Sequence, residues 1–190
     1  MTTKNKKGFT IIEVVLVLAI AGLIFLMVFI ALPALQRSQR NTQREDDMSR
    51  VLTAITQFQT NNNGKTPFNA SMAAGKLDTF VTRYLDSECT GGTATANMTK
   101  KYTSCGAQFS DPDGQPYNIE YRGAATAANA DISGALKAGG TGGPVFDHTI
   151  HAYSYATCGD EGYVKKGSGA RQVAIFFVLE GGAITCNDNH

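Results

Sequence analysis

The feature that most constrains this chain is a long apolar run near its N-terminus. Between Phe9 and Leu32 the only charged side chain is Glu13, and the only other polar side chain is Thr10. As an α-helix that rises about 1.5 Å per residue, a run of this length crosses the hydrocarbon core of a bilayer. Because all backbone polar groups of such a helix are paired within it, the segment is stable in lipid.

Three interpretations of this run compete: a secretory signal, a plain transmembrane anchor, and a third that also uses the residues before the run. The lysines at positions 4, 6 and 7 place its N-terminal end in the cytoplasm and the rest of the chain outside. A secretory signal has a short apolar core and a small-residue cleavage site, but this core is too long and Pro33 to Gln36 is a poor cleavage site. A plain transmembrane anchor explains neither Gly8, between the lysines and the run, nor the lone Glu13.

The third interpretation rests on the order of residues from Lys7 to Glu13, K-G-F-T-I-I-E. This order resembles the class III leader junction of type IV pilins and pseudopilins. In that family a membrane peptidase cuts after the glycine and methylates the new N-terminal amine. The resemblance therefore implies cleavage between Gly8 and Phe9 and N-methylation of Phe9. It also implies that Glu13 reaches the Phe9 amine of a neighbouring subunit and sets the register during assembly.

The resemblance and the change in polarity divide the chain into three parts. They are a cleaved leader peptide, 1–8, a hydrophobic transmembrane or assembly helix, 9–35, and an extracellular pilin head, 36–190. Apolar residues at three- and four-residue steps between Met48 and Phe58 extend the predicted helix, as an amphipathic half, to about residue 62. Pro33 predicts a kink within this helix, and N-N-N-G at 61–64 predicts its end.

Beyond the helix, apolar residues recur at a spacing closer to two positions than to three or four. Residues 77–85 predict a short amphipathic helix, whereas 117–121 and 145–156 predict half-buried strands. The continuous apolar run at 173–179 predicts a central strand, followed by a hairpin turn at 180–183. The expected fold class is α+β, with a long N-terminal helical spine packed on a small antiparallel β-sheet head. The pilin resemblance implies the same arrangement.

The cysteines predict disulfides rather than a metal site. They are Cys89, Cys105, Cys158 and Cys186. None forms a C-x-x-C pair, which disfavours zinc and thioredoxin-like sites, and an even number in an exported domain favours two disulfides. Of the three possible pairings we prefer Cys89–Cys105 with Cys158–Cys186, because each closes a local loop.

A D-P-D-G sequence that begins at Asp111 is a weak calcium candidate. Asp111 and Asp113 have the spacing that opens an EF-hand loop, but Arg122 occupies the twelfth position, where an acidic ligand is needed. The same residues are a strong turn signal, which we prefer. His148 and His151 are expected on opposite faces of a strand, so that one metal ion cannot bind both.

Charge and motifs argue against several functional classes. Removing residues 1–8 removes three lysines and no acidic residue, so 14 of the 17 basic side chains remain against 16 acidic ones. This balance offers no broad surface for nucleic acid, although a small basic patch and DNA as a partner stay open. No serine or cysteine has a partner base in a recognisable motif, so we expect neither enzymatic activity nor a cofactor.

The resemblance implies a structural subunit of a type IV pilus-like filament that serves adhesion, motility or DNA uptake. The alternative is a pseudopilin or minor pilin of a type II secretion or competence machine, which the N-terminal motif does not separate. A third hypothesis, an anchored extracellular enzyme or binding protein, requires a catalytic site that the sequence does not offer. The implied partners are other copies of the chain, prepilin peptidase, an inner-membrane assembly platform and membrane lipid. The expected location is a single-pass membrane protein with a cytoplasmic N-terminus before assembly, and a cell-surface pilus afterwards.

Overall fold

The computed structural model describes residues 8–68, 74–91, 99–125, 130–131, 146–159 and 163–189. Of the predicted leader, only Gly8 is among them. The chain divides into two compact units, Met1–Gln39 and Arg40–His190.

The longest element is helix α1, Ile11–Asn61, with 51 residues. It continues through Pro33, so the proline removes one backbone hydrogen bond without ending the helix. Asn63 and Gly64 have positive φ angles of 53° and 75°. The Gly64 N–H donates to the Gln59 carbonyl at 2.7 Å, which closes the last turn as in a Schellman-type cap. The end of the helix is therefore where the N-N-N-G sequence predicts it.

The described residues of the second unit form two sheets and three short helical segments besides the C-terminal part of α1. The five-stranded sheet has the order β1 (Thr99–Lys100), β2 (Asn118–Ala124), β4 (Thr149–Ser154), β7 (Val173–Val178), β8 (Ile184–Asp188). The three-stranded sheet has the order β3 (Ala130–Asp131), β6 (Tyr163–Lys166), β5 (Ala156–Cys158). The helical segments are α2 (Ala74–Phe80), the π-helix η1 (Val81–Leu85) and the 3₁₀ helix η2 (Ala107–Phe109). The predicted α+β class is confirmed.

One strand pair departs from the antiparallel sheet that the sequence predicted. Strands β2 and β4 run parallel, with Ile119 opposite Ile150, whereas the other pairs of the larger sheet are antiparallel. Parallel neighbours need a crossover of a dozen or more residues. The connection from β2 to β4 spans residues 125–148, which is long enough. The three-stranded sheet was not predicted either.

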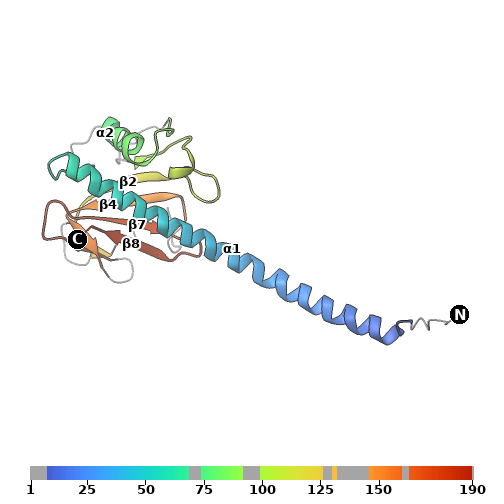
Figure 1. Ribbon diagram of the computed structural model, residues 1–190. Helices are drawn as coiled ribbons and strands as arrows, with labels where there is room; N and C mark the ends of the chain where they lie inside the picture. The colour runs from blue at the N-terminus through green and yellow to red at the C-terminus, as the bar shows by residue number, and fades with distance from the viewer. Residues whose placement is uncertain are drawn as a thin grey trace. The chain divides into compact units, whose positions relative to one another are not determined.

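Strand β7 is buried on both faces, as its continuous apolar run predicted. Every second residue, at Val173, Ile175 and Phe177, belongs to a core cluster shared with the Met48–Phe58 part of α1. The alternate residues belong to a second cluster with strands β4, β5 and β6 on the other side of the sheet. Figure 1 shows this part of α1 lying across the larger sheet. Each large apolar side chain buried in this way contributes about 1.5–3 kcal/mol.

Polar side chains at the C-terminal end of the chain also hold α1 on the sheet. The amide of Asn187 donates to the Ser49 hydroxyl at 3.1 Å, and the amide of Asn189 donates to Gln59 Oε1 at 3.0 Å. Both contacts join residues more than 100 positions apart. The amphipathic half of α1 is therefore part of the head, fixed by its apolar face and by the last strand.

Candidate functional site

The predicted cleavage site lies at the start of the first unit, directly before α1. Gly8 and Phe9 precede the first helical residue, Ile11. The Phe9 side chain is 88% exposed. No described atom lies within 4 Å of the position that a Cβ would take on Gly8. The Gly8–Phe9 bond is thus sterically accessible within the chain.

Glu13 belongs to a capping box at the first turn of α1. The backbone N–H and the hydroxyl of Thr10 both donate to Glu13 Oε2 at 2.9 Å, and the Glu13 N–H donates to Thr10 Oγ1 at 3.4 Å. The two residues satisfy donors that an unpaired helix start leaves free, and the carboxylate lies where the helix dipole favours negative charge. This box was not predicted, although the T-I-I-E spacing is its sequence signal.

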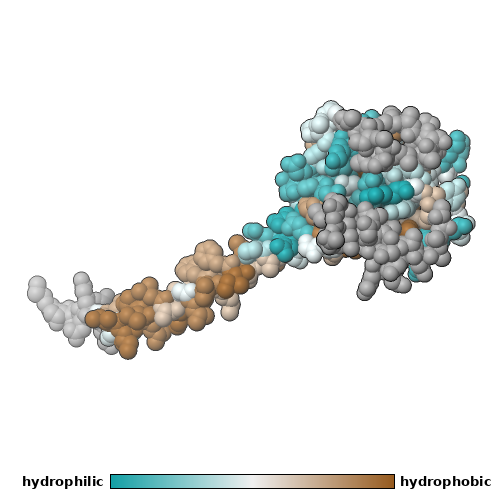
Figure 2. All heavy atoms as spheres, turned by 180° about the vertical axis from the view of Figure 1, so that it is seen from behind, coloured by the Kyte–Doolittle hydropathy of each residue, from teal (hydrophilic) through white to brown (hydrophobic). Residues whose placement is uncertain are grey.

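The following part of α1 exposes apolar side chains in all directions. The Leu, Ile, Val, Phe and Met residues from Phe9 to Leu35 are each 46–88% exposed. Figure 2 shows them as a continuous apolar surface. By length and composition this segment can cross a membrane. A helix that is apolar all round needs lipid or other protein against it.

The N-terminal segment is similar to a motif of known proteins. Residues 3–29 match the prokaryotic N-terminal methylation motif. The chain carries the class III leader signature of type IV pilins. No curated protein and no solved structure matches the chain. The motif supports a type IV pilin-like or pseudopilin precursor, a structural kind of protein.

The pilin-type leader implies processing by a peptidase and assembly into a filament. Together with the apolar helix, it fits membrane anchoring before assembly into a surface pilus. The match covers most of the leader, the capping box and most of the apolar run, but not the head.

In the head, the structure joins the cysteines in the pairs preferred from the sequence. Cys89 is bonded to Cys105 and Cys158 to Cys186. The first disulfide closes a loop of 16 positions after η1. The second joins β5 of the smaller sheet to β8 of the larger one. Each bridge is worth about 2–4 kcal/mol, mainly through the unfolded state, and the second also cross-links the two sheets.

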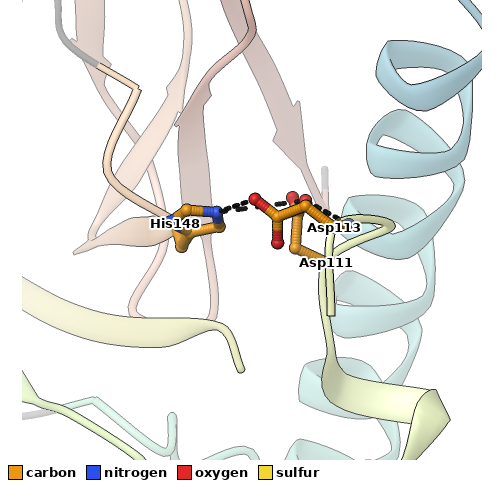
Figure 3. Close-up of side chains that lie close together, drawn as sticks. All are labelled: Asp111, Asp113 and His148. Carbon is orange, nitrogen blue, oxygen red and sulfur yellow. Dashed lines mark hydrogen bonds and ion pairs between the residues drawn. The ribbon is translucent and has the colours of Figure 1, made fainter. Parts of the chain in front are cut away.

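The D-P-D-G sequence forms the predicted turn. The Gly114 N–H donates to the Asp111 carbonyl at 2.8 Å, and the Asp113 N–H donates to Asp111 Oδ1 at 3.1 Å. A φ of 88° at Gly114 favours glycine. His148 Nε2 lies 2.6 Å from Asp113 Oδ2 (Figure 3). Burial alone would raise the pKa of Asp113, but bonds from the Gln115 N–H and His148 lower it on balance.

The ring of His148 completes a cluster of three possible metal ligands. Atoms of Asp111, Asp113 and His148 lie within 4.8 Å of one another. However, Arg44 Nε and Nη2 donate to the two Asp111 oxygens at 2.6 and 2.7 Å, and both side chains are completely buried. A guanidinium thus already neutralises Asp111 and occupies both of its oxygens. We therefore assign this turn a structural role in place of the weak calcium hypothesis.

The prediction that His148 lies in a strand is wrong. Strand β4 begins one residue later, and His148 has a φ of 58°, a left-handed conformation in which histidine is enriched. His151 does lie in the strand, where its Nδ1 is 3.3 Å from Glu120 Oε2. The two histidines have different partners and do not converge on one site.

Arg44 is the centre of a buried charge network that the sequence did not predict. Its Nη1 lies 2.8 Å from Glu180 Oε1, and its guanidinium lies 4.3 Å from the ring centre of Phe146. Arg40 Nε and Nη2 donate to the Glu180 carboxylate at 2.8 and 2.7 Å. Burial alone would lower the pKa of Arg44, but hydrogen bonds to Asp111 and Glu180 raise it on balance. The hydrogen bond from Arg40 lowers the pKa of Glu180 to about 2.

Asp111→Asn is expected to lower the free energy of unfolding by about 3–5 kcal/mol, because it removes one charge of a buried pair. The double variant Arg44→Met, Asp111→Leu is expected to cost much less, since no charge is then buried without its partner. Urea unfolding of the full chain in detergent micelles measures both. An equal loss in the two variants would show that packing, and not the unpaired charge, sets the cost.

Glu180→Gln is expected to change the pH dependence of stability. The pKa of Glu180 is about 2 in the folded chain, below its ordinary value of 4.5. Its charge therefore stabilises the fold fully above about pH 5, and this contribution is lost as the pH falls towards 2. The stability difference between wild type and variant should be largest near pH 7 and shrink with acidification. Glu45→Gln, at an exposed position of α1, is the control, and a pH-independent difference for Glu180→Gln would contradict the expectation.

Proposed function

We propose that the chain is the structural subunit of a type IV pilus-like surface filament that serves adhesion, motility or DNA uptake. The observation that carries this proposal is a leader motif followed directly by a helix that is apolar and exposed all round. Cleavage after Gly8 frees the Phe9 amine, which is then methylated. The apolar part of α1 leaves the membrane and packs against the same part of other copies.

The proposed assembly needs a directional contact. Lipid tails are as apolar as leucine, so transfer of the helix from lipid to a filament gains little from the hydrophobic effect. Apolar packing also distinguishes poorly between neighbouring registers. A charged pair does distinguish them, because a buried charge without its partner costs about 3–5 kcal/mol.

We propose that Glu13 makes that contact. Cleavage after Gly8 leaves Thr10 and Glu13 in the chain and creates a positive amine at Phe9, one residue before the capping box. In the box, Thr10 donates to Oε2 of the carboxylate. We assign the Glu13 carboxylate to the Phe9 amine of a neighbouring subunit, with Oε1 as the accepting atom. The carboxylate then caps its own helix and sets the register of the next one.

The mature protein is expected to begin at Phe9 and to carry one added methyl group. Gly8→Leu should leave the precursor uncut and abolish filaments, since a bulky residue obstructs the peptidase but meets nothing in the chain itself. Gly22→Leu is the matched control, because Gly22 is also free of close neighbours and lies away from the junction. Its leader should be removed normally. Mass spectrometry of the N-terminal peptide identifies the first residue and its methylation. A surface protein that begins at Met1 or Thr2 would contradict the proposal.

Glu13→Val is expected to leave expression, membrane insertion and cleavage intact and to reduce filament assembly strongly. Thr10→Ala breaks the capping box but keeps the carboxylate, so it should cost about 1 kcal/mol of helix stability and leave many more filaments. Filament counts by electron microscopy compare the two variants. Equal losses would mean that Glu13 acts only as a cap, and wild-type counts in Glu13→Val would exclude it as the registering contact.

The same micrographs, with mass spectrometry of sheared filaments, test the role of the chain. If it is the main component of long surface filaments, it is the major pilin. If it occurs only in a few copies, or in short structures that need a secretion or uptake machine, it is a minor pilin or pseudopilin.

A further inference from the structure

One ring nitrogen in the head lies between a hydrogen-bond donor and a hydrogen-bond acceptor. His151, on strand β4, is only 2% exposed. Arg122 Nε donates a hydrogen bond to its Nδ1 at 3.3 Å, and Glu120 Oε2 lies 3.3 Å from the same Nδ1. A ring nitrogen accepts through its lone pair or donates a proton, but it cannot do both at once. The protonation state of His151 therefore decides which of the two neighbours Nδ1 binds.

The parallel pair of β2 and β4 places Glu120 beside His151. The two residues stand opposite each other in the register of the pair, directly after Ile119 and Ile150. Both isoleucines belong to the core cluster shared with α1. Since side chains alternate between the two faces of a sheet, Glu120 and His151 lie on the face that points away from α1.

A β-bulge brings Arg122 to the same two groups. The register of β2 and β4 shifts between Tyr121 and Gly123, so Arg122 is the extra residue of the bulge. Gly123 has a φ of 109°, a conformation that favours glycine. Bulges redirect side chains, and here the Arg122 Nη2 lies 3.0 Å from Glu120 Oε2, the oxygen that also faces His151. The guanidinium and the imidazole thus compete for one carboxylate oxygen.

The other neighbours of the ring do not titrate with it. Among the described residues, the charged groups in contact with the His151 ring are Glu120 and Arg122. On β7 the opposite residue is Phe176. On β4 the titratable side chain of the same face is Tyr153, whose pKa is raised by burial, lowered by Arg122 and raised by Glu120, with a raised pKa as the net result. Its phenol therefore stays neutral wherever a histidine ordinarily changes its charge.

We propose that this group is a pH-sensitive switch in which His151 exchanges Arg122 for Glu120. With a neutral ring, Nε2 carries the proton and Nδ1 accepts from Arg122. In acid, a proton enters at Nδ1, which then donates to Glu120 Oε2. The Arg122 Nε–H loses its acceptor and faces an imidazolium, which repels the guanidinium. The switch follows from contacts within the head and does not depend on filament assembly.

Arg122 is the group that moves. Its side chain is 27% exposed, whereas that of His151 is 3% exposed. The guanidinium can therefore turn to solvent without crossing the core, and the imidazolium cannot. In acid the bulge of β2 loses its side-chain contact with β4, and the sheet face opposite α1 presents a mobile positive charge.

The test is NMR spectroscopy of the full chain in detergent micelles between pH 8 and pH 5, where histidine ordinarily changes its charge. The ring ¹⁵N shifts of His151 report which nitrogen carries a proton, and the Nε–H signal of Arg122 reports its hydrogen bond. We expect the Arg122 signal to change with the same midpoint as His151. Its protection against hydrogen exchange, relative to free arginine at the same pH, should fall at least tenfold in acid. An unchanged Arg122 signal while His151 protonates, or a His151 ring that is still neutral at pH 5, would overturn the proposal.

Three variants identify the groups. His151→Gln should abolish the transition of Arg122. Glu120→Gln keeps an oxygen acceptor without its charge, so both transitions should move to lower pH; an unmoved midpoint would overturn the exchange even if His151→Gln folds poorly. His148→Gln is the matched control, because the other described histidine binds Asp113, and it should leave the Arg122 transition unchanged. A transition that persists in His151→Gln, or disappears in His148→Gln, would show that another group drives it.

Discussion

The buried guanidinium of Arg44 is the contact on which the head depends. It joins α1 to the turn at Asp111, 67 positions away, and to Glu180 between β7 and β8. Taking the charges of Arg44 and Asp111 out of water is costly, and the cost is offset only because the guanidinium binds Asp111 in bidentate geometry and also reaches the partly exposed Glu180. Arg44 precedes Met48 by one helical turn, so it extends the apolar stripe of α1. The network thereby determines which face and which turn of the helix meets the sheet.

In the other unit, Glu13 is also a charge that needs a compensating partner, and it finds one within its own helix turn. It lies at the start of a helix whose surroundings must be apolar, and Thr10 compensates it locally through a capping box. That solution needs no second segment of the chain. The apolar side chains that follow, as far as Leu35, have no such local partner and are exposed. A single copy in water is therefore incomplete, and lipid or other copies must cover this surface.

Features set by local pattern were predictable from the sequence, and features set by distant pairing were not. The end of α1 at N-N-N-G, the buried strand β7 and the α+β class follow from periodicity and turn chemistry within short windows. The parallel β2–β4 pair and the Arg44–Asp111 contact depend on how segments far apart meet. The capping box is the exception, since its T-x-x-E signal is local although the box was not among the predicted features.

Charges in apolar surroundings specify position because leaving one unpaired costs more than the difference between two apolar packings. Apolar contacts along a helix change little when it slides by one turn, since each side chain meets another of similar size. A buried charge has one acceptable partner, and a slip of one turn removes it. Arg44 acts in this way for the helix on its sheet. In the proposed filament Glu13 acts in the same way between copies. The leader glycine then has a second consequence: only after cleavage does an amine exist at Phe9 for that carboxylate, so the uncut precursor lacks the contact that sets the register.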